Sequence, residues 1–577
     1  MRERQVAKQA MGDGRGVRRA LTPGPAPRGH PVATGEGRGI PATPIAPRLA
    51  QRAPALARNQ GTLLFVGGTL VFVLVAAWLS FGVRLAVGDA LSRTLSAVRV
   101  EHSRSPRLAA IGFVWPPLPT LAQLPLVLWP QLGFYGFSGG IVSALATGGL
   151  LATLNRLLRW ANVTAWWRGL LLVLFALNPM LLFYAGNGMS ELPFLFFFTV
   201  ASFAFVRWQV STHWRDLIVG GLATACMFGC RYDAIPYAAA FAAAVCLVFL
   251  VGERRFNPSR VEANLFAYLV PVAYAVGMWL YFNYLIEGDP LYFARNPYSN
   301  SFIVRNVASN AAVLALQGSW LTTGLFLIKT MLGLSPLLLT LLGVALFVIL
   351  RQRNVGVLSV LMVLLVVPAF QLWSYRSGQT FGFLRFFLSM QPAGLLLAAT
   401  LLQRSTGSAR TALLALSAVG LLLGIWTTAA AMEKGGPGGI FADQVVFEET
   451  DFLGALRHPT TPIDNYAAAR VAASVLRTRF AGQAVTIMGD ISIDEVVLFS
   501  AMPQKFIGPS DPDFDQALQS PTAYADYLLT MQVADADPRY MALRQVYPHV
   551  YEAGIKGYTL DQQIGPYRLY RRTGGSS

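Results

Sequence analysis

Residues 170–206 read LLLVLFALNPMLLFYAGNGMSELPFLFFFTVASFAFV, which is two apolar runs on either side of a short polar turn. The full runs, 168–185 and 190–208, are long enough to cross a hydrocarbon core of about 30 Å. The turn at 187–193, where the two runs meet, contains one ionisable residue, Glu191. The stretch therefore predicts two membrane-spanning helices joined by a tight loop.

Runs of the same kind recur along most of the chain and predict eleven spans. They lie at 62–86, 138–155, 168–185, 190–208, 216–230, 236–252, 264–284, 333–350, 357–373, 386–403 and 411–431. A further apolar segment, 311–330, is interpreted as a helix that lies at the outer surface or dips into it. Counting it as a span would place Arg351 and Arg353 outside. An odd number of spans puts the two ends of the chain on opposite sides.

The basic residues indicate which end of the bundle is cytoplasmic. With the N-terminus inside, the inner loops contain twelve arginines and three acidic residues, as the positive-inside rule requires. The net charge of +17 is spread over these loops and the N-terminal tail, while only 13% of all residues are charged. This distribution indicates topology rather than a phosphate-binding face, so we expect no nucleic-acid partner. The expected location is the plasma membrane.

Composition divides the chain into three regions. Residues 1–58 are rich in Pro, Gly, Ala and Arg and are expected to be a disordered, basic cytoplasmic tail. Residues 59–432 form the predicted transmembrane domain. Residues 433–577 contain twelve basic and seventeen acidic residues and no cysteine, and are expected to fold outside the cytoplasm.

The last region predicts a small α/β domain. Short apolar runs at 485–488, 495–499 and 527–529 alternate with helical stretches such as 465–480, and 567–570 suggests a closing strand. The fold class predicted for the whole chain is therefore mainly α: a polytopic membrane bundle with a small extracytoplasmic α/β domain.

The first outer segment follows the first span and begins with a helical apolar pattern, Leu91, Leu95 and Val98. This pattern favours an amphipathic helix that lies along the membrane interface. Asp89 stands at its start and has two interpretations of equal weight. It is either the N-cap of that helix or a functional carboxylate.

Ionisable residues near a bilayer are costly and mark candidate functional sites. The membrane part has nine carboxylates, and six of them face outward in the predicted topology. Glu191 either caps the helix that follows it or serves a site. Arg231 and Asp233 either form a local ion pair or belong to the same site. Arg376 and Arg385 flank a short outer turn from which both could reach a cavity.

These motifs, taken in order, resemble the GT-C class of membrane glycosyltransferases, and specifically the bacterial family 39-like, dolichyl-phosphate-mannose-mannosyltransferase-like group. The similarity covers roughly residues 60–400. It rests on Gly88-Asp89-Ala90-Leu91-Ser92-Arg93, Val114-Trp115-Pro116-Pro117-Leu118-Pro119, Asn178-Pro179 leading into Met189-Ser190-Glu191-Leu192-Pro193, Arg231-Tyr232-Asp233, and Gly288-Asp289-Pro290-Leu291-Tyr292-Phe293 with Asn296-Pro297-Tyr298-Ser299.

The resemblance implies transfer of a sugar from a polyprenyl-phosphate donor at the outer face of the membrane, by a hexosyltransferase of mannosyltransferase-like type. Asp89 would be the catalytic base and Glu191 the second acid of the site. The residues expected to bind substrate are Arg93, Arg231, Asp233, Tyr292, Arg376 and Arg385. The acceptor, whether protein, lipid or polysaccharide, stays open.

Two departures from the family pattern bear on these roles. The first loop has one Asp in place of an acidic pair, so a divalent metal is possible but not indicated. Cys226 and Cys230 lack a His or carboxylate partner in their run and are interpreted as packing residues. In the second departure, Leu192 separates Glu191 from the proline that usually follows the acid directly, which leaves open whether Glu191 reaches the site.

Two other functions compete with sugar transfer. A transporter or lipid flippase is the main alternative, although the two halves of the chain show no repeat and the acids lie at span ends. A non-enzymatic scaffold of the cell envelope would leave the clustered outer acids unexplained.

Overall fold

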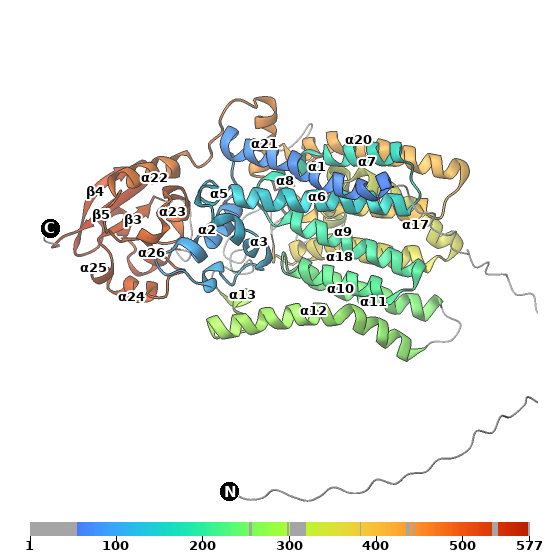
Figure 1. Cartoon of the computed structure of the whole chain (residues 1–577), viewed down its shortest axis with the longest axis horizontal. Coiled ribbons are helices and arrows are strands. Elements are labelled where there is room, and N and C mark those ends of the chain that lie inside the picture. The colour runs from blue at the N-terminus through green and yellow to red at the C-terminus, as the bar shows by residue number, and fades with distance from the viewer. Residues whose placement is uncertain are drawn as a thin grey trace, which may run out of the picture. The chain divides into compact units, whose positions relative to one another are not determined.

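The structure is a computed structural model that describes residues 55–252, 257–296, 299, 319–380, 382–433, 439–441, 445–532 and 541–574. Helices dominate this part of the chain, and a single small sheet follows them near the C-terminus (Figure 1). Of the predicted tail, residues 1–54 lie outside the described residues, and α1 begins at Ala55.

The membrane part is a bundle of long apolar helices (Figure 1). Eight helical segments in the described residues are long and apolar enough to span a bilayer, and two bent helix pairs bring the number to ten. The bundle consists of α1 (Ala55–Ala77) with η1 (Trp78–Val83), α6 (Phe137–Trp160), α7 (Ala165–Ala176) with α8 (Pro179–Gly186), α9 (Glu191–Ser211), α10 (Trp214–Phe228), α11 (Ala234–Gly252), α12 (Pro258–Glu287), α16 (Trp320–Leu334) with α17 (Pro336–Gln352), α18 (Val355–Arg376), η3 (Leu384–Phe387) with α19 (Met390–Leu402), and α20 (Gly407–Met432).

Helix α10 corresponds to the predicted span 216–230. Its fifteen residues are fewer than the about 20 of a typical span. It nevertheless returns the chain across the bundle, because Glu191 at the start of α9 and Arg231 just after α10 form an ion pair with an N···O distance of 2.8 Å. With α10 added to the eight apolar segments and the two bent pairs, the helices of the described residues correspond to the eleven predicted spans.

Two spans are broken at Xaa-Pro pairs. α7 and α8 meet at 72°, and the Asn178 side chain accepts hydrogen bonds from the first free N–H groups of α8 while Pro179 opens that helix. Ser335 and Pro336 do the same at the 116° bend between α16 and α17. The predicted surface helix 311–330 falls partly outside the described residues, and its described end belongs to α16.

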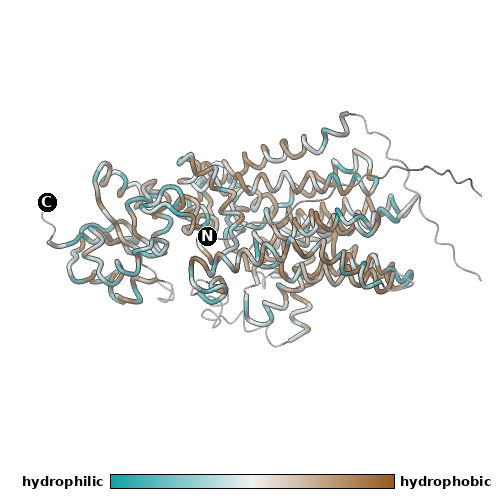
Figure 2. The backbone as a smooth tube through the Cα atoms, turned by 60° about the horizontal axis from the view of Figure 1, so that its bottom comes forward, coloured by the Kyte–Doolittle hydropathy of each residue, from teal (hydrophilic) through white to brown (hydrophobic). Residues whose placement is uncertain are grey.

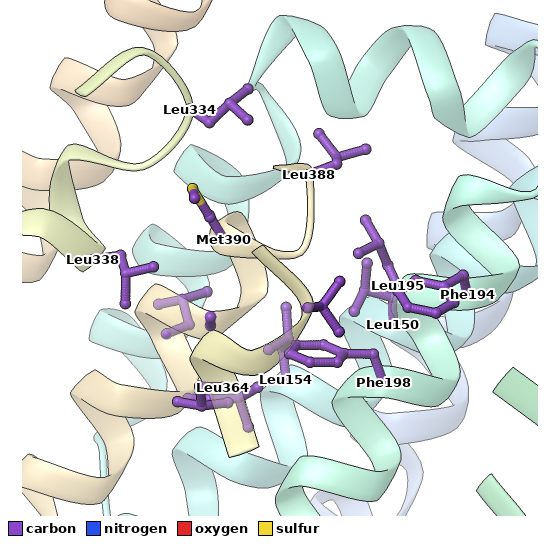
Figure 3. Packing of buried hydrophobic residues seen from close by; sticks show 14 of the residues in the cluster. Leu150, Leu154, Phe194, Leu195, Phe198, Leu334, Leu338, Leu364, Leu388 and Met390 are labelled. Atoms are coloured by element: carbon purple, nitrogen blue, oxygen red, sulfur yellow. The ribbon is translucent and has the colours of Figure 1, made fainter. Parts of the chain in front are cut away.

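The core of the bundle is apolar and densely packed. Figure 3 shows leucines, methionine and phenylalanines from α6, α9, α18 and α19 meeting there. Every residue of α19 is buried, so it is the central helix. On α12, by contrast, Phe266 and Tyr274 are 60% and 69% exposed and lie on the lipid-facing side of the bundle. Figure 2 shows that hydrophobic residues dominate the bundle while polar ones are frequent in the C-terminal part.

Short elements connect the first two spans at one end of the bundle. They are α2 (Gly88–His102), η2 (Leu108–Ile111), α3 (Leu118–Leu121), α4 (Leu124–Val127) and α5 (Pro130–Phe134). The predicted membrane-facing stripe of α2 is instead buried in protein: Leu91, Leu95 and Val98 belong to the same apolar cluster as residues of the C-terminal domain. The interface-helix interpretation of this stripe is therefore wrong, because the stripe is already covered.

The C-terminal domain is built on a five-stranded sheet in the order β2-β1-β3-β5-β4. β1 pairs in parallel with β2 and β3, while β5 lies antiparallel between β3 and β4. The strands are β1 (Ile487–Met488), β2 (Phe506–Ile507), β3 (Tyr527–Met531), β4 (Tyr558–Ile564) and β5 (Tyr567–Arg572). The helices are α21 (Glu448–Arg457), α22 (Ala467–Arg479), α23 (Asp494–Ser500), α24 (Phe514–Gln519), α25 (Pro521–Tyr524), α26 (Ala542–Val546) and α27 (Val550–Ala553).

One apolar run of this domain is a helix rather than part of the sheet. Residues 495–499 lie in α23, where Val496, Val497 and Leu498 are all buried between α22, α2 and the sheet. A short helix that is covered on every side has the same continuous apolar pattern as a buried strand, so periodicity does not separate the two.

Candidate active site

A cavity of about 390 Å³ lies at the end of the bundle that carries α2. Six of the predicted site residues line it: Asp89, Glu191, Arg93, Arg231, Asp233 and Arg385. They come from four separate segments of the chain, which the fold brings together. Aromatic side chains, among them Trp115 and Phe386, complete its wall.

Asp89 lies in the first turn of α2 and does not cap it. The N-cap position is Val87, and no side chain there accepts a capping hydrogen bond. The carboxylate instead forms an ion pair with Arg385, whose Nη2 lies 3.0 Å from Asp89 Oδ2. The Asp89 side chain is 45% exposed, so one face of it remains open to a ligand.

Glu191 is the first residue of α9, and its side chain is only 3% exposed. Its Oε1 atom accepts a hydrogen bond from Arg231 at 2.8 Å and lies 4.0 Å from Arg385 Nε. The insertion of Leu192 before the proline does not move Glu191 out of the site. Helix α9 begins at Glu191, and the Glu191 side chain lines the cavity.

Arg231 joins two acids that follow different spans. Its Nε atom donates to Asp233 at 2.8 Å, and its Nη1 atom donates to Glu191 at the same distance. Asp233 also accepts a hydrogen bond from Gln371 of α18. The predicted local pair therefore exists, and it is also part of the site.

Arg93 occupies the next turn of α2, one turn after Asp89. Its guanidinium donates to the Pro116 carbonyl at 3.4 Å and lies over the Trp115 ring at 4.8 Å. The Trp-Pro-Pro motif thus forms the wall that holds this arginine. Burial lowers the pKa of Arg93, while Asp89 and Glu191 oppose that shift.

Three buried polar atoms of the site have no hydrogen-bond partner in the protein: Nε of Arg93, Oε2 of Glu191 and Nε of Arg385. All three residues line the cavity. Buried polar groups in proteins are almost always paired, so unpaired ones at a cavity indicate a polar ligand. Two of the three atoms are donors on cationic groups, which suits an anion.

Two predicted residues do not belong to the cavity wall. Tyr292 of α13 (Tyr292–Arg295) does not line the cavity, whereas its neighbour Phe293 does. The Phe293 ring stacks on Tyr232 with ring centroids 4.8 Å apart. Arg376 ends α18 and lies over the ring of Trp320, 4.2 Å from its centroid. The one-residue difference between Tyr292 and Phe293 reflects the orientation of a single helical turn.

The site also includes residues that the sequence did not single out. Tyr184 of α8 donates a hydrogen bond of 2.6 Å to Glu449, a buried acid in the first turn of α21. The charge of Glu449 acts on Arg385. The acidic pair Glu448-Glu449, in the segment that follows the last span, was the available signal. Burial raises the pKa of Glu448.

No group of three His, Cys, Asp or Glu residues that could hold a metal ion occurs in the part of the chain that the structure describes. Asp89, Glu191 and Asp233 are each paired with an arginine instead. This donor set fits an anionic ligand better than a cation.

Neither a model of a protein family nor a curated protein matches the chain. Solved structures are similar to it. The crystal structure of ArnT from Cupriavidus metallidurans bound to undecaprenyl phosphate has a TM-score of 0.50 and 12% sequence identity, and the match covers 89% of this chain and 98% of ArnT. The apo structure of ArnT gives the same values.

The archaeal oligosaccharyltransferase AglB from Archaeoglobus fulgidus, in complex with an inhibitory peptide and a dolichol-phosphate, has a TM-score of 0.44 and 10% identity. That match covers 89% of this chain and 74% of AglB. The likeness to ArnT, which spans nearly the whole of both chains, confirms the GT-C-like fold that the sequence predicts.

Proposed function

We propose that the protein is a membrane glycosyltransferase that moves a sugar from a polyprenyl-phosphate donor to an acceptor. The observation that carries the proposal is a half-exposed carboxylate, Asp89, that pairs with Arg385 in a cavity where buried N–H donors of Arg385 and Arg93 lack partners. ArnT, whose fold this chain shares, was solved with undecaprenyl phosphate bound. A cationic pocket beside a half-exposed carboxylate suits a phosphate-linked substrate.

The reaction exchanges one C–O bond for another. The acceptor oxygen forms a bond to the anomeric carbon of the sugar, and its proton passes to Asp89 as general base. The bond between that carbon and the phosphate oxygen breaks, and the electron pair leaves with the polyprenyl phosphate. Arg93 and Arg385 neutralise the charge that develops on this leaving group. Glu191 and Asp233 hold Arg231 beside the sugar.

The site and the C-terminal domain are proposed to face outward, with the N-terminus in the cytoplasm of a cell bounded by the plasma membrane. The basic loops support this orientation, since Arg351 and Arg353 lie at the other end of α18 from the site-side η3 turn. On this proposal the residues from 433 onward form an extracytoplasmic domain. The donor that the resemblance suggests first is a polyprenyl-phosphate hexose such as mannose.

The alternative of a transporter draws on one observation, the two broken spans. Broken helices in transporters bind ions and substrates near mid-depth. Here the break at Asn178 is occupied by uncharged side chains, which bond one another: Gln391 donates to Asn178, and Asn178 donates to Thr428. The charged cluster lies at the bundle end instead, which favours sugar transfer.

The test is transfer in vitro with the full chain in lipid vesicles. Asp89→Asn should lower the rate of sugar transfer from a radiolabelled undecaprenyl-phosphate hexose by about 10²–10⁴-fold, the usual contribution of a general base. Glu101→Gln, an acid-to-amide change on the same helix outside the cavity wall, is the matched control. Full activity of Asp89→Asn would overturn the assignment of the base. A co-purified lipid-linked sugar, identified by mass spectrometry, would name the donor.

A further inference from the structure

The C-terminal domain forms hydrogen bonds with the segment just before α2. The backbone N–H groups of Ile463 and Asp464 donate to the Val83 carbonyl at 2.8 and 3.2 Å. The Asn465 side chain pairs with both backbone groups of Ala86: it accepts from Ala86 N at 3.1 Å and donates to Ala86 O at 2.8 Å. A two-point pairing of this kind fixes the position of the peptide as well as its distance.

The next residue of the same segment abuts the first residue of α2. A Cβ atom added at Gly88 would lie 3.0 Å from the Tyr466 hydroxyl oxygen, so the phenol lies directly against the backbone beside Asp89. Burial, followed by the nearby carboxylates, raises the pKa of Tyr466, and its hydroxyl therefore stays protonated.

A second set of contacts with the C-terminal domain lies beyond the middle of α2. Arg99 Nη2 donates to Asp494 Oδ1 at 2.7 Å, and both side chains are largely buried, with 11% and 15% exposed. Arg107 donates to the Ser510 carbonyl at 2.6 Å. Arg104 forms an ion pair with Asp513. The helix is thus fixed on both sides of Asp89's position along the chain.

These arginines occupy the edge of the sheet where ligands usually bind. In open α/β sheets the binding crevice lies outside the carboxyl ends of the parallel strands, where the strand order reverses. The order β2-β1-β3 places that reversal at β1. A Cβ atom on Gly508, which follows β2, would lie 3.3 Å from Arg99 Nη2. The crevice is therefore filled by the chain itself.

From these contacts we infer that the C-terminal domain is the positioning device of the active site. Asn465 and Asp494 hold α2 so that Asp89 meets Arg385, and this edge of the sheet binds α2 in place of a substrate. The inference rests on the proposed function for the role of Asp89. It assigns both residues as positioning residues, since neither lines the cavity.

The physical reason is the sensitivity of catalysis to placement. Ten residues separate Asp89 from Arg99 along α2, or about 15 Å at the rise of an α-helix. Without these two sets of contacts with the C-terminal domain, α2 can tilt or slide against the bundle. A displacement of about 1 Å at the reacting groups costs up to about 10²-fold in rate.

Four variants of the full chain test the inference. Asn465→Asp keeps the shape of the side chain and removes the donor to Ala86 O. Asp494→Asn removes the charge that pairs with Arg99. Glu552→Gln, on an exposed part of the same domain, is the control. The double variant Arg99→Asp with Asp494→Arg restores the pair with its charges exchanged.

The first readout is hydrogen exchange in peptides that cover residues 83–102, which needs no substrate. Asn465→Asp and Asp494→Asn should speed exchange there by about tenfold while leaving the peptides of α9 and α19 protected. The second readout is transfer from a radiolabelled undecaprenyl-phosphate hexose. Here kcat should fall about tenfold or more with KM for this donor within about twofold, because placement and not donor binding is lost. The double variant should recover most of kcat.

The outcomes separate this inference from the proposed function. Unchanged exchange in both single variants would overturn the inference, as would faster exchange with unaltered kcat. A wild-type protein that transfers no sugar would overturn the proposed function, and the exchange data would still decide whether the domain holds α2.

Discussion

At the scale of single residues, the site is an alternation of charges. Arg385 lies between Asp89 and Glu191, and Arg231 lies between Glu191 and Asp233. Each acid is held by a cation, so the buried charges compensate one another. Among these three acids only Asp89 has an exposed face, which is why it is the proposed base.

The Tyr184–Glu449 hydrogen bond should contribute to stability as well as to the site. Tyr184→Phe leaves the buried Glu449 carboxylate without this donor, so the free energy of unfolding should fall by about 1–3 kcal/mol. Thermal unfolding of the purified protein in detergent measures the change. Tyr135→Phe, at a 50% exposed tyrosine, is the matched control and should have no effect. Equal unfolding temperatures for wild type and Tyr184→Phe would contradict the prediction.

Glu495 predicts a pH dependence of stability. Burial, assisted by Asp494, raises the pKa of this carboxyl to about 7. The folded protein therefore holds a proton that the unfolded chain has lost above about pH 4.3. Stability contributed by this group is fully present below that pH and is lost as the pH rises through about 7.

Glu495→Gln keeps the neutral form at every pH and should remove that loss. The unfolding temperature of the wild type should fall between pH 5 and pH 7.5 relative to Glu495→Gln, and the two curves should run parallel above pH 8. Unfolding followed across this pH range checks the result. Curves that run parallel throughout the range would show that Glu495 titrates normally.

At the scale of elements, glycines allow the helices at this end of the bundle to pack closely. Gly188 adopts φ +85° in the turn before α9, and its Cα lies close to Gly139 of α6. Beside them, a Cβ atom on Gly140 would lie 2.7 Å from the Gly186 carbonyl oxygen and 2.8 Å from the Ala76 Cβ. Three helices approach one another there at backbone distance, as small residues permit in membranes.

Gly140→Ala should therefore destabilise the bundle by about 1–3 kcal/mol, because the clash involves backbone that cannot rotate away. It should also lower activity, since α8 and the turn carry Tyr184 and Glu191 into the site. Gly169→Ala on α7, where nothing lies within 4 Å of the added atom, should be neutral or slightly stabilising. Unfolding temperatures and transfer rates of Gly140→Ala and Gly169→Ala check this prediction. Equal values for the two variants would contradict the close packing at Gly140.

The elements also show how far sequence reasoning reaches. Hydropathy predicted the spans, because lipid requires long apolar helices whatever their partners. It singled out Asp89, Glu191 and Arg231, because ionisable groups near a bilayer are costly, and the structure places all three at one cavity. It did not distinguish Tyr292 from Phe293, which depends on the rotation of one turn, nor the helix of residues 495–499 from a strand.

Long-range pairings were beyond its reach for a different reason. Tyr184 and Glu449 are 265 residues apart, and neither carries a local signal of the other. The same holds for α2: its apolar stripe is equally suited to a bilayer or to a protein surface. Only the arrangement of the C-terminal domain decides between them.

At the scale of the whole molecule, topology is the prediction to check. In a background without Cys226, Cys230 and Cys246, single cysteines replace the exposed Glu552 of the C-terminal domain and the exposed Gln352 at the end of α17. A membrane-impermeant maleimide added to intact cells should label position 552 but not 352, which should react only after lysis. Labelling of 352 alone in intact cells would invert the proposed orientation.

The contacts between the C-terminal domain and α2 have a consequence for biosynthesis. Arg99 emerges from the ribosome 395 residues before Asp494, which at about 5–20 residues per second is a delay of about 20–80 s. During that interval every span can insert, yet the helix that carries the proposed base has no partner to fix it. If the proposed function holds, a nascent or truncated chain would therefore reside in the membrane without acting on lipid-linked sugars, and activity would begin only when translation is complete.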